Sequence, residues 1–261
     1  MPLLLNCDLA ESDDPGALVV EERVMPHIHL ANIACGFHAG NEAVMQTTLD
    51  LARRHGVRVA AHPGYPDREH FGRRSLTLTT AELVRFIVEQ LETLGRLAEA
   101  AHIPVEFVKP HGALYNDMMR DDRVRGTVMR ALAQWDERPT LVMLATAEAD
   151  RHRHEAAQHG LNVAFEAFAD RGYDDAGLLL PRHHSGALLH GRDILRQVEQ
   201  LQQDGSVTTA GGRRLPLAAD TLCVHGDHAD SVALIADIRR LLERGDASAA
   251  TTVPPRDTAE R

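Results

Sequence analysis

The sequence predicts an α/β barrel made of seven strand–helix units, and three observations support this fold class. The chain has 261 residues, a length at which α/β barrels commonly form one domain. Short apolar runs alternate with amphipathic stretches of helical length, as in parallel sheets built from right-handed βαβ units. Most of the apolar runs end in polar residues. We therefore expect a single barrel domain over residues 1–245 and a polar, flexible tail over residues 246–261.

Seven apolar runs are the predicted strands. Each is almost continuous in hydrophobic residues, which suits a parallel sheet that is buried on both faces. In chain order they are Leu3–Asp8, His29–Cys35, Val57–His62, Val105–Lys109, Thr140–Leu144, Leu161–Glu166 and Asp220–His225.

Six amphipathic stretches are the predicted helices. The longest starts close to a capping box formed by Thr79 and Glu82, and its apolar residues share one stripe. Two segments depart from the alternation: residues 63–75 indicate a long loop rich in glycine, proline and charge, and residues 207–217 indicate a β-hairpin. The predicted helices are Ala43–His55, Thr80–Ala101, Asp122–Gln134, Ala147–His159, Arg192–Gln203 and Ser231–Arg244.

Composition excludes several classes of protein. The 38 acidic residues outnumber the 28 basic ones, and the resulting charge of −10 disfavours binding to nucleic acid or anionic lipid. Three cysteines (Cys7, Cys35 and Cys223) lie far apart and form no CxxC pair, so we expect small buried packing residues rather than a disulfide framework. The sequence shows no membrane-spanning run and no signal peptide, so we expect a cytoplasmic protein.

Polar side chains at the strand ends are the candidate functional residues. In a parallel barrel the C-terminal ends of all strands open on one face, so residues far apart in the sequence converge there. A single histidine at such a position is usually a packed residue, but here four of them each stand near a glycine, which lets backbone approach a ligand closely. These four are His38, His62, His111 and His225.

The only lysine of the chain, Lys109, lies at one of these strand ends between Val108 and Pro110. A semi-buried ammonium needs an anionic partner, which could be Asp8, a substrate carboxylate or a phosphate. Arginines on neighbouring loops are further candidates for binding an oxyanion, and they are Arg73, Arg74, Arg171 and Arg182.

Several motifs are missing from the sequence. It contains no GxxxxGK[ST] loop for ATP, no GxGxxG at the start of a helix and no GxSxG elbow. Dinucleotide-dependent oxidoreductases and serine hydrolases are therefore disfavoured.

Several linked strings resemble the LamB/YcsF family, to which the A subunit of 5-oxoprolinase belongs, over roughly residues 3–244. They are Asn6–Leu9, Ala31–Gly40, Ala61–Asp67, Phe71–Arg74, Val108–Asn116, Phe168–Arg171 and Asp220–Asp227. One departure lies after the first strand, where the family usually has Leu-Gly-Glu and this chain has Leu9-Ala10-Glu11.

The resemblance implies a (β/α)7 TIM-like barrel of the glycoside hydrolase/deacetylase type. It also implies a hydrolase that opens 5-oxo-L-proline to L-glutamate together with the 5-oxoprolinase subunits B and C. ATP would be a co-substrate, with Mg²⁺, bound by this chain or wholly or partly by its partners. No tightly bound cofactor is expected, and assembly into a homo-oligomer is compatible with this picture.

The resemblance and the strand-end positions together select the candidate site residues. As hypotheses, Asp8 would act as general base, oriented by His38 or His225, and Lys109 with His62 would stabilise the oxyanion. Arg73 or Arg171 would hold the substrate carboxylate. The catalytic candidates are Asp8, His38, His62, Lys109, His111, His225 and Asp227, and the substrate-binding candidates are Asn6, Glu11, Arg73, Arg74, Tyr115, Asn116 and Arg171.

Two alternative functions stay open at the level of sequence. The chain could be a stand-alone metal-dependent deacetylase or amidohydrolase, with a divalent ion held by Asp8, His38 and His62. It could also be a subunit that binds substrate without catalysing a reaction.

Overall fold

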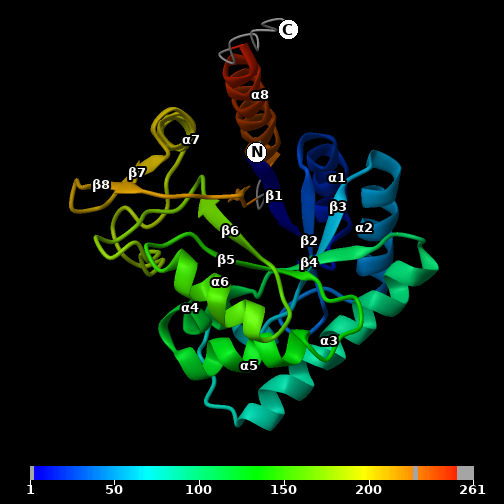
Figure 1. Ribbon diagram of the computed structural model, residues 1–261. Helices are drawn as coiled ribbons and strands as arrows, with labels where there is room; N and C mark the ends of the chain where they lie inside the picture. Colours follow the sequence, from blue (N-terminus) through cyan, green and yellow to red (C-terminus); the bar gives the residue numbers. More distant parts are fainter. Residues whose placement is uncertain (1–2, 226–228, 252–261) are drawn as a thin grey trace, which may run out of the picture.

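Seven parallel strands close into a barrel in the computed structural model, which describes residues 3–225 and 229–251 (Figure 1). The first strand pairs with both the second and the last, and this closes the sheet. All seven predicted strands are confirmed, with small differences at their ends. They are β1 (Leu4–Leu9), β2 (Leu30–Ala34), β3 (Arg58–His62), β4 (Val105–Val108), β5 (Thr140–Leu144), β6 (Val163–Phe168) and β9 (Thr221–Cys223).

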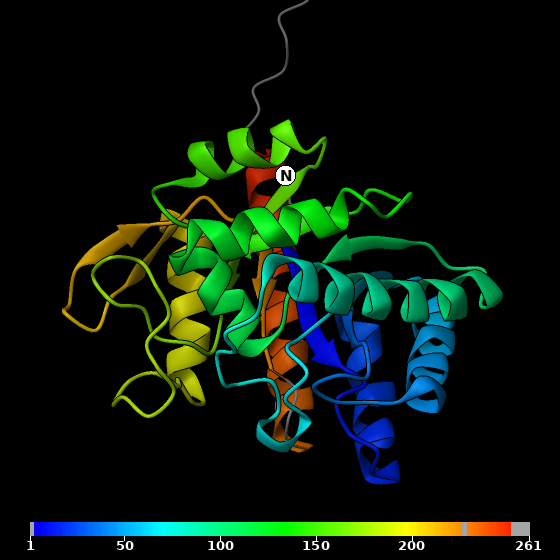
Figure 2. The ribbon, with the colours of Figure 1, turned by 90° about the horizontal axis from the view of Figure 1, so that it is seen from below.

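Helices cover the outside of the barrel (Figures 1 and 2). The six predicted helices are confirmed as α2 (Glu42–His55), α3 (Thr80–Ala100), α5 (Asp122–Leu132), α6 (Ala149–Gln158), α7 (Arg192–Asp204) and α8 (Ala229–Thr251). The last of these extends past residue 245, where we expected the domain to end. The rest of the predicted tail, residues 252–261, lies outside the described residues.

Two helices were not predicted, α1 (Pro15–Val24) and α4 (Gly112–Arg120), nor were two short 3-10 turns, η1 (Met25–His27) and η2 (Arg68–His70). The Asp14-Pro15-Gly16 string resembles a turn, but Asp14 caps α1 and Pro15 occupies its first turn, where the missing N–H costs nothing.

The barrel interior has two layers, because alternate residues of each strand point inward. Small and apolar side chains form the floor, which consists of Leu30, Ala60, Phe107 and Val142 with Ala164 packed against them. Two positions further along, Leu144 follows Val142, whereas the inward side chains from the other four of these five chain segments become polar. These are Asn32, His62, Lys109 and Glu166, and all four are buried.

The long connection between β6 and α7 runs over the C-terminal end of the barrel. Two isolated bridges shape it, Arg171 with Leu188 and Tyr173 with Leu179. Gln197 of α7 anchors its start by donating to the carbonyl oxygens of Phe168, Ala169 and Arg171. The predicted hairpin after α7 is confirmed as β7 (Ser206–Thr208) and β8 (Arg214–Pro216).

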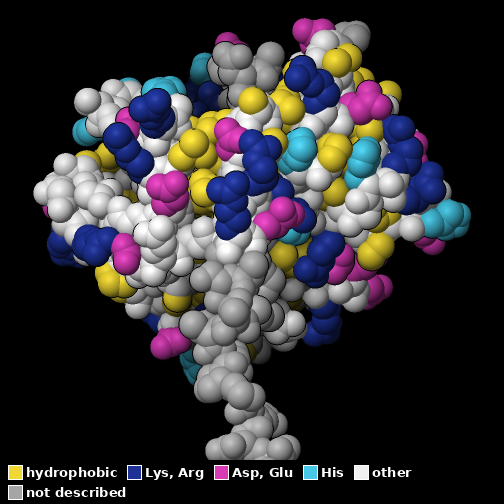
Figure 3. All heavy atoms as spheres, turned by 90° about the horizontal axis from the view of Figure 1, so that it is seen from above, with side chains coloured by type: hydrophobic (Ala, Val, Ile, Leu, Met, Phe, Trp, Pro, Cys, Tyr) yellow, Lys and Arg dark blue, Asp and Glu magenta, His cyan; other side chains and the backbone are white. Residues whose placement is uncertain are grey.

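The molecular surface mixes both signs of charge. On the face shown in Figure 3, basic and acidic side chains are interspersed among apolar ones. Within the described residues, every helix is too short or too polar to serve as a transmembrane segment.

Candidate functional site

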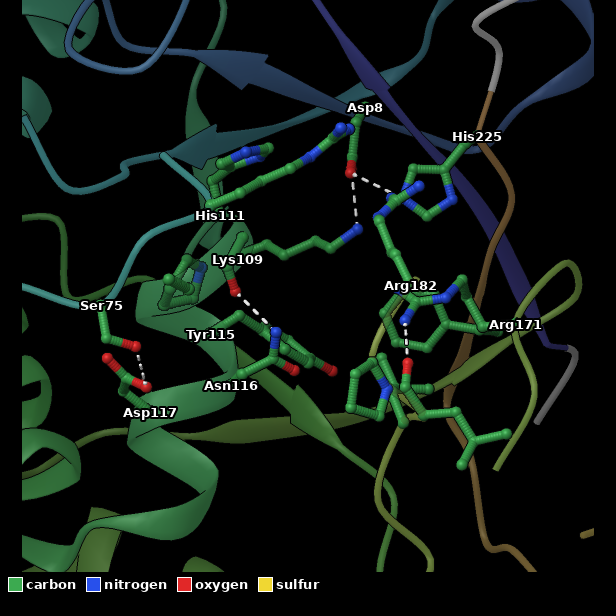
Figure 4. A pocket seen from close by; sticks show the side chains of 18 of the residues that line it. Asp8, Ser75, Lys109, His111, Tyr115, Asn116, Asp117, Arg171, Arg182 and His225 are labelled. Carbon is green, nitrogen blue, oxygen red and sulfur yellow. Dashed lines mark hydrogen bonds and ion pairs between the residues drawn. The ribbon is translucent and has the colours of Figure 1, made fainter. Parts of the chain in front are cut away.

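Two adjoining cavities lie at the C-terminal ends of the strands, where barrel active sites form. The first is about 370 Å³ (Figure 4) and the second about 410 Å³, and both are lined in part by Asp8 and Arg73. The first is also lined by His62, Lys109, His111, Tyr115, Asn116, Arg171, Arg182 and His225, and the second by Glu11.

Lys109 and Asp8 form a buried ion pair at the junction of the cavities. The lysine Nζ lies 2.7 Å from Asp8 Oδ1, and both side chains are almost fully buried. Burial alone would raise the pKa of Asp8, but His62 and Lys109 outweigh it and hold the pKa well below its usual value. Burial alone would lower the pKa of Lys109, and Asp8 with Cys223 outweighs that effect and raises it. The pair is therefore charged.

A polar network inside the barrel holds this pair in place. Asn32 Nδ2 donates to Asp8 Oδ1 and to Asn6 Oδ1, at 2.7 Å in both cases. Asn6 Nδ2 in turn donates to Glu166 Oε1 at 3.2 Å, and Glu166 Oε2 is 3.5 Å from Lys109 Nζ. Burial raises the pKa of Glu166 to about 7. The lysine is thus oriented from several strands at once.

His225 is fixed by a carboxylate on the opposite side of the cavity. Asp170 Oδ2 accepts hydrogen bonds from His225 Nδ1 at 2.8 Å and from its backbone N–H at 3.1 Å. The other ring nitrogen, Nε2, lies 3.7 Å from Asp8 Oδ2 and 3.3 Å from Arg182 Nη2. Burial would lower the pKa of His225, but Asp170 outweighs it and the pKa is raised. This is the geometry of an oriented proton-transfer group.

The remaining histidines meet around Glu11, at the edge of the second cavity. Glu11 Oε1 is 3.1 Å from His111 Nδ1, 3.4 Å from His38 Nε2 and 3.8 Å from His62 Nε2. The rings of His38 and His111 stack with centroids 3.8 Å apart. Burial lowers the pKa of His38 to about 3, so this ring is neutral at physiological pH.

The predicted arginines separate into two groups. Arg73 and Arg171 line the first cavity, and Arg171 is buried and donates to the carbonyl oxygens of Ala187 and Leu180. Arg74 instead pairs with buried Asp67 at 2.7 Å and does not line either cavity, so the structure does not bring it to the site.

The other predicted residues also gather at the site, apart from one that falls outside the described residues. Tyr115 and Asn116 line the first cavity from α4. Asn6 lies in the buried polar layer beneath it, where its Oδ1 is 3.5 Å from Lys109 Nζ. Asp227 belongs to the part of the chain that is not described.

Three contributors to the site are not among the predicted candidates: Asn32, Glu166 and Asp170, the last of which follows the sixth predicted strand. Asn32 and Glu166 are polar residues at inward positions of predicted strands, so strict alternation along each strand could have identified them. The three cysteines are buried thiols, as expected. Cys223 does more than pack, because its Sγ lies 3.0 Å from Lys109 Nζ.

Known proteins resemble this chain over nearly its whole length. Residues 3–256 match the LamB/YcsF family. The chain is 45% identical over 244 residues to the A subunit of 5-oxoprolinase from Vibrio parahaemolyticus, covering 93% of this chain and 96% of that protein. It is 42% identical over 246 residues to the protein of the same name from Pseudomonas fluorescens, covering 94% and 98%. The crystal structure of a lactam utilization protein from Thermus thermophilus superposes with a TM-score of 0.81 at 32% identity, covering 96% of this chain and 98% of that one.

Proposed function

The chain belongs to the LamB/YcsF family, and on this premise we propose that it is the lactam-hydrolysing subunit of an ATP-dependent 5-oxoprolinase. It would bind an activated form of 5-oxo-L-proline and open the ring to L-glutamate. Relatives named as the A subunit of 5-oxoprolinase and a structural relative named for lactam utilization support this substrate class.

The observation that carries the proposal is a cationic cavity in an acidic protein. The chain has a net charge of −10, yet among the described residues that line the first cavity, Lys109 and four arginines stand against two carboxylates, Asp8 and Asp117. A cavity of about 370 Å³ suits a small ligand. A lactam that carries a carboxylate, and more so one that also carries a phosphoryl group, matches this charge.

The site geometry suggests a role for each group. Asp8 stays ionised because its pKa is low, so it suits orienting Lys109 better than the base role that sequence analysis gave it. We assign proton transfer to His225, positioned by Asp170. Lys109 would stabilise negative charge that develops on the substrate oxygen. Arg171, already fixed by backbone carbonyls, would hold the substrate carboxylate.

The reaction needs ATP because a five-membered lactam is a stable amide. In our proposal the amide oxygen is first phosphorylated, and water then adds to the ring carbon. The C–N bond breaks as the ring nitrogen takes a proton from His225, which leaves an acyl phosphate. A second water molecule hydrolyses this to glutamate and phosphate.

We assign the phosphorylation step, with Mg²⁺, to the partner subunits B and C. The sequence of this chain has no GxxxxGK[ST] loop, so nucleotide binding is better placed on those partners. Use of ATP and three buried thiols both favour the cytoplasm as its compartment.

An assay of glutamate release from 5-oxoproline and ATP tests the proposal. We expect turnover when this chain is combined with subunits B and C, and none from the chain alone. Lys109→Met and His225→Gln should each lower kcat by at least about 100-fold, as loss of a charge-stabilising or proton-transfer group does. Arg96→Met, which removes a surface pair with Glu42, is the matched control and should keep wild-type rates.

The proposal fails if folded Lys109→Met and His225→Gln proteins support wild-type turnover, or if the reconstituted complex releases no glutamate. Circular dichroism of each variant establishes that it is folded. Glutamate release without ATP by this chain alone would instead favour a stand-alone amidohydrolase.

A further inference from the structure

Glu11, His38, His62 and His111 form a cluster that has more hydrogen-bond acceptors than donors where the four side chains meet. His62 Nδ1 lies 2.6 Å from the carbonyl oxygen of Lys109, and His111 Nε2 lies 2.9 Å from that of Phe71. A carbonyl oxygen only accepts hydrogen bonds, so both of these ring nitrogens carry the hydrogen. When both rings are neutral, His62 Nε2 and His111 Nδ1 therefore carry no hydrogen, and each presents a lone pair.

These two lone pairs face each other across 3.0 Å and also face a carboxylate. Glu11 Oε1 lies within 3.8 Å of both nitrogens. His38 is fully buried, and among the described residues neither of its ring nitrogens, nor Glu11 Oε1, has a hydrogen-bond partner. Such an arrangement repels itself unless an extra proton or a metal cation lies among the four groups.

The spacing of these atoms matches that of a metal coordination shell. Ligand atoms about 2.1 Å from a tetrahedral Zn²⁺ are roughly 3.4 Å apart. The separations involving Glu11 Oε1 are 3.1, 3.4 and 3.8 Å, and the two facing nitrogens are 3.0 Å apart. The four ligand atoms all lie within 4.8 Å of one another.

Two of the rings also have the outer hydrogen bonds that metal-binding histidines use. A ligating histidine usually donates its second N–H to a carbonyl or carboxylate, which fixes the ring and its tautomer. His62 and His111 both do so, to Lys109 and Phe71. Gly64 and Gly72 leave room for His38, because a Cβ at either glycine would lie 2.7–2.8 Å from His38 atoms.

We propose that Glu11, His38, His62 and His111 bind a divalent first-row transition metal, with Zn²⁺ as the representative ion. This set replaces Asp8, the carboxylate that sequence analysis placed with His38 and His62, by Glu11 and adds His111. Asp8 is committed to Lys109, and its other oxygen, Oδ2, lies 3.3 Å from His62 Nε2. The metal would therefore lie beside the Asp8–Lys109 pair, where the two cavities meet.

A second cluster of ligand-type atoms, from Asp8, Cys223 and His225, is a poorer metal site. Lys109 Nζ lies 2.7 Å from Asp8 Oδ1 and 3.0 Å from Cys223 Sγ. The ammonium already supplies the positive charge there and would repel a metal ion.

Metal titration of the purified chain tests the proposal without any assay of activity. The chain is first treated with chelator and then titrated with Zn²⁺ by calorimetry, and with Co²⁺ by visible spectroscopy. We expect one bound equivalent, Co²⁺ bands typical of nitrogen and oxygen ligands, and competition between the ions. Glu11→Gln and His111→Gln should each weaken Zn²⁺ binding about 100-fold or more, since loss of an outer partner alone costs about 10–100-fold.

Two control variants separate this site from other histidines. His152→Gln removes a buried histidine of α6 outside the cluster, and His225→Gln removes the ring from the second cluster. Both should bind Zn²⁺ as the wild type does. Thermal melting of every variant confirms folding.

The proposal is overturned if the wild-type chain binds neither ion, in which case protons supply the positive charge in the cluster. It is also overturned if His225→Gln abolishes binding while Glu11→Gln and His111→Gln leave it intact. Because the readout is metal binding, failure of the 5-oxoprolinase assay would not affect this test, and the reverse also holds.

Discussion

Among single residues, Glu166 shows how burial changes the chemistry of a side chain. It is a carboxyl at an inward barrel position with no exposed surface, and burial raises its pKa to about 7. Its neighbours Lys109 and Asn6 only partly offset this effect. Near neutral pH it is therefore poised between its charged and neutral forms, beside the lysine that we assign to charge stabilisation.

The raised pKa of Glu166 predicts a pH-dependent contribution to stability. The ordinary pKa of this group is 4.5, so the folded state binds its proton more tightly than the unfolded state. The resulting stability is fully present below pH 4.5 and is lost as the pH rises through 7. Glu166→Gln does not titrate at this position. Its unfolding free energy relative to wild type should therefore be larger at about pH 8 than at about pH 5, by about 1.4 kcal/mol per unit of pKa difference.

Urea unfolding of both proteins at the two pH values measures this gain. Glu155→Gln, which alters a partly exposed carboxyl with a lowered pKa, is the control and should show no such gain. An equal stability difference at the two pH values would show that the Glu166 pKa is not raised.

Ala10 is a second residue whose local conformation matters for the site. Its φ is +59°, in the left-handed region that disfavours side chains other than glycine. Glu21 Oε1 accepts from its N–H at 2.7 Å, and this contact holds the turn that delivers Glu11. Glycine adopts this conformation without that cost, so the alanine strains the backbone here.

Replacing Ala10 with glycine should therefore relieve strain. Removing the alanine side chain from the left-handed region stabilises the folded state by about 1–2 kcal/mol. The greater conformational entropy of glycine in the unfolded chain lowers the unfolding free energy by about 0.5–1 kcal/mol. Ala10→Gly should thus raise the unfolding free energy by up to about 1.5 kcal/mol. Ala43→Gly, in α2, is the control and should lower it by up to about 1 kcal/mol. Destabilisation by Ala10→Gly, measured in urea, would argue against strain at this position.

At the scale of elements, α3 is the longest of the barrel's helices between β1 and β9 and begins with a complete capping box. Thr79 Oγ1 accepts from the Glu82 N–H, and Glu82 Oε2 accepts from the Thr79 N–H at 2.8 Å. The helix packs against α2 and α5, so a frayed start would loosen the outer layer of the barrel.

Thr79→Ala removes the reciprocal cap and should cost about 1 kcal/mol. For a protein of this size, that loss lowers the Tm by roughly 2–4 °C. Thr93→Ala is the matched control, because Thr93 lies within the same helix and its hydroxyl donates to the carbonyl of Glu89 rather than capping an end. Differential scanning calorimetry measures both, and equal Tm values for the two variants would contradict the role of the cap.

At the scale of the whole molecule, the barrel interior contains one layer that stabilises the fold and another that forms the candidate site. The apolar floor packs at the N-terminal part of the strands, and the charged layer lies directly above it. This arrangement keeps water from entering the site from below, which strengthens every charge interaction above it. Phe107 is the largest side chain of the floor, and Arg58 covers the ring from outside with its guanidinium carbon 4.5 Å from the centroid.

Truncation of this floor should destabilise the whole barrel. Phe107→Ala leaves a cavity at the point where several strands meet, and we expect a loss of about 3–5 kcal/mol of unfolding free energy. Phe37→Ala, at a half-buried ring that contacts Phe86, is the control and should cost less. A loss below that of the control, measured by urea unfolding, would show that the floor does not support the barrel.

The order of residues along the chain was enough to predict the barrel and the face that carries the site. Continuous apolar runs identify buried parallel strands, and the position of Asp8, His62, Lys109 and His225 at their ends follows from strand direction alone. Local signals were weaker for α1 and α4, because proline and glycine begin helices as well as turns.

The pairing of the polar groups, by contrast, became visible only in three dimensions. Glu11 as well as Asp8 meets the histidines, Arg74 turns away to Asp67, and Glu166 and Asp170 join the site. Such pairings depend on the inward register of each strand and on the path of each loop. These are set when the barrel closes and brings together residues more than a hundred positions apart, such as Asp8 and Lys109.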